Sequence, residues 1–324
     1  MSPFAKLSAT LATTRSTIGG EAERDTITTA HKFGGSSLAN AERYRRVAAI
    51  LLARKDVRQI TVVSAMQGVT DALIALSSTA AKRGDWHAQL GALRERHLQA
   101  ARDLLGDQAN ALLEWFDARH TELHDILHAL SVLGIPARGA IEAIQGLGEV
   151  WSAHLLRAHI EALGDRCSLL DARDVLVVAH GELGVAVDWE ASAARLADWR
   201  TQHADDRIII TGFVARDGDG RATILGRNGS DFSAAIFAAL FNAHELHIWT
   251  DVDGVLSADP RLVPEAIALN ALSYEEACEL AYFGAKVIHP QTMLPAMALG
   301  LPIHIRNTFK PEHPGTRIAR VGDA

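Results

Sequence analysis

A lysine stands just before four small residues, separated from them only by Phe33, in the stretch HKFGGSSLAN. Gly34 and Gly35 leave the backbone bare, so its N–H groups can come close to a phosphate. The ammonium group of Lys32 adds a mobile positive charge, and Ser36 adds a hydroxyl donor. In the common P-loop the lysine follows the glycines instead. The stretch therefore indicates either a different kind of phosphate site or an ordinary turn.

A second polar group follows an apolar run in VVSAMQGVTD, which carries Ser64, Thr70 and Asp71. Hydroxyl groups at the carboxyl end of a buried strand commonly hold a small polar ligand. The alternative is that Thr70 or Asp71 caps the helix that follows.

Two further acids open helical segments. Glu149 follows Gly-Leu-Gly in QGLGEVWSAHLL, where an acid in the first turn is also stabilised by the helix dipole. In LGRNGSDFSAAIF, Arg227 and Ser230 stand at a helix N-terminus and make an anion site. Asp231 in the same motif either caps this helix or orients a lysine and a metal ion.

The stretch IWTDVDGVLSADPR places Thr250, Asp251 and Arg261 where they could hold the ribose and phosphates of a nucleotide. It lacks the spacing of an EF-hand, which excludes that kind of calcium site. Lys286, in YFGAKVIHP, either complements a helix C-terminus or contacts a phosphate. The fifteen histidines form no HExxH motif and no metal-ligand cluster in the sequence, so packing roles are expected for those of HELHIW.

These residues require a scaffold of alternating strands and helices. TITTAHKF and RQITVVSAM are expected strands, joined by a helix in ANAERYRRVAAILLARK that Asn40 can cap. This β–α–β unit puts the glycine loop at the carboxyl end of its first strand, where open α/β sheets bind ligands. Residues from about 70 to 163 are expected to be mostly helical.

The C-terminal half alternates more clearly, with a capping box of Ser273 and Glu276 opening its second helix. The expected elements are a strand in RIIITGFVA, a helix in SDFSAAIFAALFNA, a strand in ELHIWTD, a helix in SYEEACELAYFG and a strand in LPIHIRN.

Composition narrows the class of protein. The 324 residues carry a net charge of −7 with both signs mixed, which argues against a nucleic-acid partner. Two cysteines far apart indicate no disulfide framework and fit a reducing, cytoplasmic setting. No apolar run approaches the length needed to cross a membrane.

Taken in order, seven motifs resemble those of aspartate kinases, in the amino-acid kinase family, over about residues 30–318. They are KFGGSS, VVSA followed by T-D, GLGE, LDARD, GRNGSD, WTDVDGV with DPR, and FGAKVIHP. HKFGGSSLA and the asparagine of GRNGSD look most like the kinase part of bifunctional aspartokinase–homoserine dehydrogenases. The resemblance implies an α/β fold: an αβα sandwich around a mainly parallel sheet (amino-acid kinase or carbamate kinase-like), with a helical segment in the N-terminal lobe.

The first residues are rich in Ser, Thr and Ala, so residues 1–28 are expected to be a disordered tail, with a transit peptide as the alternative. The resemblance also implies a reaction and a division of the rest of the chain, with 29–205 an aspartate-binding lobe and 206–324 an ATP-binding lobe. The reaction would be ATP + L-aspartate → 4-phospho-L-aspartate + ADP, the first step toward lysine, threonine and methionine. Mg²⁺ would arrive with ATP, without direct protein ligands, and a homodimer is plausible.

Residue roles follow from the matching motifs. Lys32 would bridge the moving phosphoryl group and the substrate, and Asp231 would hold Lys32. Aspartate would be contacted by Ser64, Thr70, Glu149, Arg227 and Ser230. The nucleotide and its phosphates would be contacted by Gly34, Gly35, Ser36, Thr250, Asp251, Arg261 and Lys286.

Two departures from the family are visible. Leu256 stands where the family often has an aromatic residue near the nucleotide, which bears on how tightly ATP is held. The chain also runs only a few residues past PGTRI, without length for ACT or dehydrogenase domains. The expectation is that lysine and threonine do not inhibit this chain.

Two alternatives remain. Another amino-acid kinase, acting on glutamate, acetylglutamate, carbamate or UMP, would lack the pairing of GLGE with GRNGSD. A non-catalytic copy of the domain would lack Lys32, Asp231 or Lys286. Both motifs and all three residues are present, which favours a working aspartate kinase.

Overall fold

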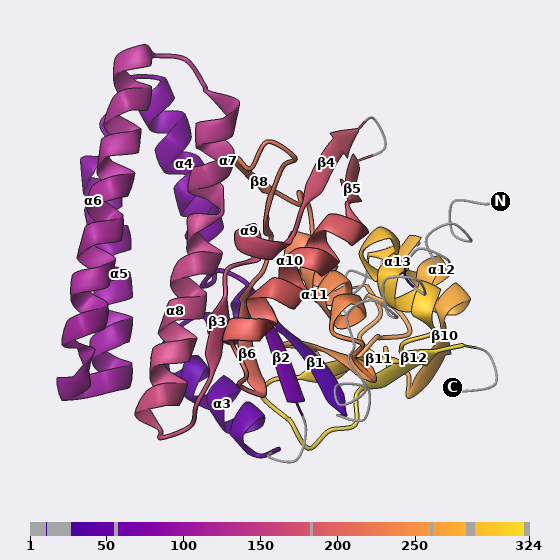
Figure 1. The fold of residues 1–324 in the computed structure, drawn as a ribbon. Helices are drawn as coiled ribbons and strands as arrows, with labels where there is room; N and C mark the ends of the chain where they lie inside the picture. Colours follow the sequence, from indigo (N-terminus) through magenta and orange to yellow (C-terminus); the bar gives the residue numbers. More distant parts are fainter. Residues whose placement is uncertain are drawn as a thin grey trace.

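The computed structural model describes residues 11, 27–54, 58–181, 184–259, 262–282 and 289–320. An eight-stranded sheet lies between helices on both faces (Figure 1), in the order β10-β12-β11-β9-β1-β2-β6-β3. The strands are β1 Thr28–Phe33, β2 Arg58–Val63, β3 Ser168–Leu170, β6 Arg207–Thr211, β9 Glu245–Thr250, β10 Ala271–Ser273, β11 Ile303–Asn307 and β12 Thr316–Ala319.

Most of this sheet is parallel. Only β11 and β12 pair antiparallel, so β12 and its parallel neighbour β10 run against the other six strands. Two hairpins lie outside the sheet, β4 Val178–Gly181 with β5 Gly184–Val187, and β7 Val214–Arg216 with β8 Ala222–Ile224. The expected mainly parallel α/β sandwich is confirmed.

Two hydrophobic cores fill the faces of the sheet because successive strand side chains point to opposite sides. Val62 packs in the core that contains Phe237 of helix α11 (Gly229–Leu240). Val63 packs in the core that contains Tyr44 of helix α3 (Ala41–Leu52). Both faces of β2 are therefore buried, as the continuous apolar run of this segment predicts.

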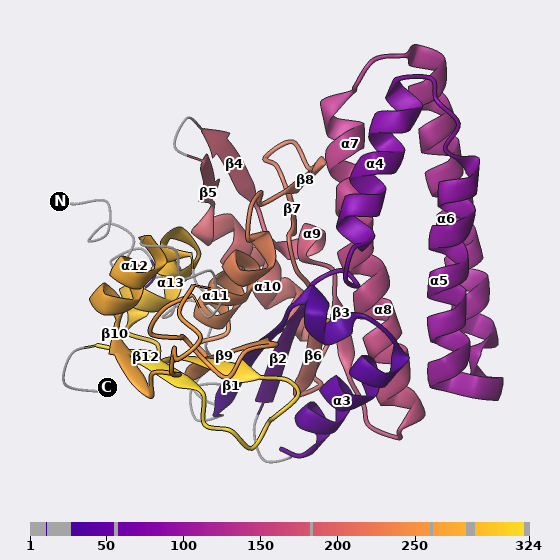
Figure 2. The same ribbon diagram turned by 180° about the vertical axis from the view of Figure 1, so that it is seen from behind.

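A group of long helices forms one side of the molecule, visible from both directions (Figures 1 and 2). The predicted helical segment is confirmed as α4 Val69–Ala81, α5 His87–Leu105, α6 Asn110–Leu133, α7 Arg138–Gln145 and α8 Leu147–Ala162. The remaining helices of eight or more residues are α10 Trp189–Gln202, α12 Tyr274–Tyr282 and α13 Pro290–Leu299, with the single turn α9 at Ala172–Val175. Within the described residues, no helix is both long and apolar enough to cross a membrane.

Two of the predicted helix caps are confirmed. Asn40 caps α3 by accepting from the backbone N–H of Arg43 at 3.1 Å. Ser273 and Glu276 form the reciprocal capping box, at 3.1 and 2.7 Å. The proposed cap of α4 is wrong: Gly68, with φ of +79°, occupies that position, and Thr70 and Asp71 lie in the first turn.

One predicted element is broken. RIIITGFVA does not form a single strand, because β6 ends at Thr211 and the chain resumes as β7 at Val214. Phe213 between them has φ of +67°, and a Cβ at Gly212 would lie 2.8 Å from the carbonyl oxygen of Val63. This turn points the chain toward the site described next. Helix α13, which contains Pro295, was not predicted. The expected tail lies almost wholly outside the described residues, and the lobe boundary stays a prediction.

Candidate active site

A cavity of about 790 Å³ opens at the carboxyl ends of β1 and β2. It lies between the β2–α4 turn, the start of α8 and the start of α11. Eight of the predicted site residues line it: Lys32, Gly35, Ser64, Thr70, Glu149, Arg227, Ser230 and Asp231. Segments almost 200 residues apart in the chain thus meet where an open parallel sheet binds its ligand.

An ion pair joins the two halves of this cavity. Nζ of Lys32, near the end of β1, lies 2.7 Å from Oδ1 of Asp231 in the first turn of α11, and both side chains are mostly shielded from solvent. The N-cap position of α11 belongs to Asn228, so Asp231 does not cap the helix. Of the two roles open from the sequence, holding the lysine is the one this geometry supports.

The glycines beside Lys32 are required by close packing. A Cβ at Gly34 would lie 3.3 Å from Nζ of Lys32, in the space the ammonium group uses. A Cβ at Gly35 would lie 3.2 Å from the carbonyl oxygen of Ala65. Gly35 faces the cavity, whereas Ser36 directs its carbonyl to the guanidinium of Arg43. Gly34 and Ser36 do not line the cavity wall.

Glu149 is a buried acid in the first turn of α8, only 4% exposed. The backbone N–H of Ala65 donates to its carboxylate, but Oε2 has no hydrogen-bond partner among the described residues. Burial raises the pKa of this carboxyl to about 8, and the charge of Lys32 only partly offsets that effect. A buried acid with an unused oxygen at a cavity wall is suited to a cationic ligand group.

Arg227 is free to bind an anion. Its side chain is exposed at the cavity mouth, and the structure gives it no ion-pair partner within the described ranges. Ser230 lies three residues later in the first turn of α11, where backbone N–H groups favour negative charge.

The structure describes only some of the residues that were predicted to contact the nucleotide. Thr250 ends β9, and its hydroxyl donates to the exposed carboxylate of Asp251 at 3.2 Å. Neither residue lines the cavity, although the N–H of Gly34 bonds the carbonyl of Trp249 next to Thr250, at 3.3 Å. Arg261 and Lys286 lie outside the described residues, so the nucleotide half of the site stays a prediction.

Some cavity residues were missed by the sequence analysis, namely Gln67, Ile74, Gln145, Phe213, Ile224 and Asn228. Phe213 reaches the site through its positive φ, which a bulky aromatic residue does not signal in sequence. Gln145 lies one turn before Glu149 in the QGLGE motif, which was the available signal.

Comparison with known proteins decides the family. The sequence model of the amino acid kinase family matches residues 28–307. The chain belongs to the amino acid kinase family. It is 44% identical, over 90% of its length and 32% of the relative's, to bifunctional aspartokinase/homoserine dehydrogenase 1, chloroplastic, of Arabidopsis thaliana. It is 32% identical, over 92% of its length and 55% of the relative's, to the Arabidopsis aspartokinase 2, chloroplastic.

Solved structures agree. The crystal structure of Escherichia coli aspartokinase III in complex with aspartate and ADP matches with a TM-score of 0.81 and 28% identity, over 91% of this chain and 64% of that one. UMP kinase of Bacillus anthracis, at 17% identity and a TM-score of 0.50, shares the fold alone. The expected resemblance to the kinase part of the bifunctional enzymes is confirmed, and the chain spans 32% of the first such relative.

The buried carboxyl of Glu149 predicts a pH dependence of stability. The folded chain keeps this proton up to about pH 8, whereas the unfolded chain releases it near the ordinary glutamate pKa of 4.5. At this group the folded state therefore binds more protons in that window, so Glu149 contributes a fall in stability as pH rises, of about 1.4 kcal/mol per pH unit.

We expect Glu149→Gln to remove this slope from the free energy of unfolding, measured with urea between pH 5.5 and 7.5 without ligand. Glu114→Gln, at an exposed position of α6, is the matched control and should keep the wild-type slope. Equal slopes in all three proteins would contradict the burial of a protonated Glu149.

Proposed function

We propose that this chain transfers the γ-phosphoryl group of ATP to the side-chain carboxylate of L-aspartate, forming 4-phospho-L-aspartate. The observation that carries the proposal is the Lys32–Asp231 ion pair in a cavity that also holds Glu149 and Arg227. The cavity thus offers a cation to a phosphoryl group. Its acid and its arginine complement the ammonium and carboxylate groups of an amino acid. The matched proteins, which are aspartokinases and include one complex with aspartate and ADP, support the same reaction.

The chemistry needs positioning more than proton transfer. The nucleophile is a carboxylate, which is already ionised at neutral pH, so no general base is required. The difficulty is bringing this anion to a polyphosphate, which cations and N–H donors overcome. Lys32 would neutralise charge on the moving phosphoryl group, an effect worth ~10²–10³ in rate for one preorganised donor.

The substrate would be held by its two ends. Arg227 can bind the α-carboxylate through two parallel hydrogen bonds, and Glu149 can accept the α-ammonium group. Ser64, Thr70 and Ser230 line the same cavity and offer hydroxyl groups to the carboxylates. An ammonium ion at Glu149 would favour its ionised form, so substrate binding would release the proton that burial retains.

Mg²⁺ fits this site as part of MgATP. Near the glycine loop, Asp231 is engaged by Lys32, and Asp253 of the predicted nucleotide loop is bonded by Asn307 and Lys310 at 2.6 and 2.7 Å. These two carboxylates are therefore occupied, which suits an ion held mainly by phosphates and water. Bound in this way, Mg²⁺ would neutralise charge on the phosphates of ATP while the γ-phosphoryl group leaves ADP for the carboxylate of aspartate.

Several wider statements belong to the same proposal. The product would enter the synthesis of lysine, threonine and methionine. The chain would act in the cytoplasm and would form a homodimer. The plant relatives carry the word chloroplastic in their names, so a plastid is the competing location. Neither cysteine forms a disulfide, in keeping with a reducing compartment.

The reaction can be tested by trapping its product. Purified chain, MgATP, L-aspartate and hydroxylamine should give a coloured hydroxamate, because hydroxylamine attacks the acyl phosphate. Tubes with L-glutamate, or without an amino acid, should stay colourless. A signal with glutamate would overturn the substrate assignment. No signal from folded protein, checked by circular dichroism, would overturn the proposed activity of this chain.

A second test addresses the carboxylate clamp. Arg227→Ala should raise KM for aspartate by about ten- to a hundred-fold, the loss of a charged hydrogen-bonded pair, with a smaller effect on kcat. Arg221→Ala, on the neighbouring hairpin and outside the cavity, should leave KM unchanged. An unaltered aspartate KM in Arg227→Ala would show that another group binds the α-carboxylate.

A further inference from the structure

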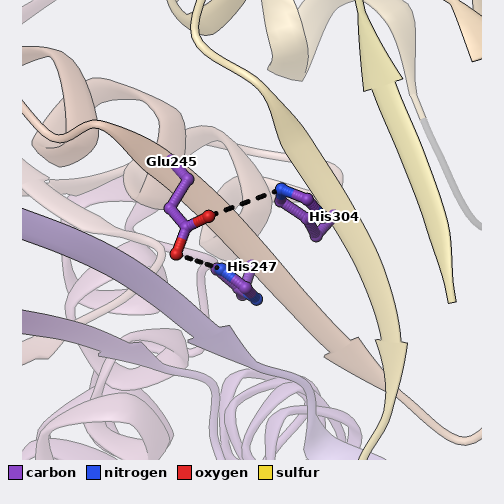
Figure 3. Close-up of side chains that lie close together, drawn as sticks. All are labelled: Glu245, His247 and His304. Carbon is purple, nitrogen blue, oxygen red and sulfur yellow. Dashed lines mark ion pairs between the residues drawn. The ribbon is translucent and has the colours of Figure 1, made fainter. Parts of the chain in front are cut away.

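Glu245, His247 and His304 form a compact cluster away from the site described above (Figure 3). Each offers one ligand atom, and these atoms all lie within 4.8 Å of one another. Packing roles were expected for the histidines of HELHIW, and the sequence showed no metal-ligand cluster; the structure brings Glu245 and His247 of this stretch together with His304. The third member lies 57 positions after His247, so spacing along the chain could not reveal it.

The strand pairing places the three side chains on one face. Glu245 and His247 are two residues apart in β9 and therefore point to the same side. His304 is the cross-strand partner of His247 in β11, and the two rings stack with centroids 4.7 Å apart. Nε2 of His247 lies 2.9 Å, and Nε2 of His304 3.5 Å, from the two carboxylate oxygens of Glu245.

His247 is poorly satisfied for a buried imidazole. The residue is 3% exposed, and Nδ1 has no hydrogen-bond partner among the described residues. Nε2 lies 2.9 Å from a carboxylate oxygen of Glu245, an ion-pair contact that is not well aligned as a hydrogen bond. Poorly satisfied buried nitrogens are costly, and a metal ion shared with the carboxylate would satisfy this ring. His31 packs behind it, with ring centroids 5.3 Å apart.

The cluster faces a cavity of about 620 Å³, also lined by Arg54, Arg306 and Arg317. Arg54 contacts Glu245 at 3.3 Å and would have to move for an ion to bind. Two imidazoles and one carboxylate suit a borderline ion such as Zn²⁺, whereas Mg²⁺ and Ca²⁺ prefer oxygen ligands. Three protein ligands leave an open position, and the arginines would attract an anion to it.

We propose that Glu245, His247 and His304 bind a divalent transition-metal ion of the Zn²⁺ class, with an anion from the arginine-lined cavity as the fourth ligand. The site lies at the start of β9, roughly 17 Å along the strand from Thr250 at five steps of ~3.3 Å. It is thus separate from the proposed kinase site, and its occupant would link β9 to β11. The proposal does not depend on the kinase activity.

The test uses the full, tag-free chain after removal of metal with a chelator. Calorimetric titration with Zn²⁺ should show one tight equivalent, and Co²⁺ should give the intense visible absorption of a four-coordinate site with nitrogen ligands. Zn²⁺ should also raise the Tm. His304→Gln, at a partly exposed position, should weaken Zn²⁺ binding at least tenfold while circular dichroism stays unchanged. His128→Ala, an exposed histidine of α6, should bind as wild type.

Several outcomes would overturn the proposal. One is a folded wild-type chain that takes up no Zn²⁺. Another is Zn²⁺ binding of equal affinity in wild type and His304→Gln, which would place the ion elsewhere. Weak Co²⁺ absorption, which is typical of oxygen ligands, would also place the ion elsewhere. Binding of inorganic phosphate by the metal-free chain without any Zn²⁺ binding would show a plain anion cavity. If His304→Gln does not fold, Glu245→Gln replaces it with the same expected loss.

Discussion

The ion pair between Lys32 and Asp231 is the interaction on which the site depends. Shielding two charges from water is costly unless they lie close together, and Nζ of Lys32 lies 2.7 Å from Oδ1 of Asp231. That separation requires the end of β1 and the first turn of α11 to meet, and a Cβ at Gly34 would intrude on the ammonium group. The parallel sheet, the glycine loop and the buried helix α11 together bring these two charged groups into contact.

Two acids of the cavity, Asp231 and Glu149, have different surroundings. Asp231 has the ammonium group of Lys32 beside it, whereas Glu149 is buried, has one oxygen without a hydrogen-bond partner among the described residues, and has its pKa raised to about 8 by burial. A carboxyl group with so strongly raised a pKa in a cavity is typical of active sites. In the proposed reaction, Asp231 positions the ammonium group of Lys32, and Glu149 binds the ammonium group of the substrate.

Local signals in the sequence predicted much of the fold. A β-branched stretch located β1, a continuous apolar run located β2, and short-range caps located the starts of α3 and α12. They could do so because these features depend on residues within a few positions of each other. Eight cavity residues were also predicted, because each stands at a strand end or a helix start, where an α/β fold brings such residues together.

What the sequence could not show depends on tertiary contacts. The turn at Phe213 exists because Gly212 packs against the carbonyl of Val63 in a neighbouring strand. The cluster of Glu245, His247 and His304 depends on the register between β9 and β11. Both are set by strand pairing over long separations, which hydrophobic periodicity does not report.

The most direct test of the central claim is a double-mutant cycle on the rate of acyl phosphate formation, with Lys32→Met, Asp231→Asn and the double variant. If Asp231 acts by holding Lys32, the double variant should be no slower than Lys32→Met alone. If the two losses multiply instead, the residues act independently, and the ion pair is not the unit on which catalysis depends.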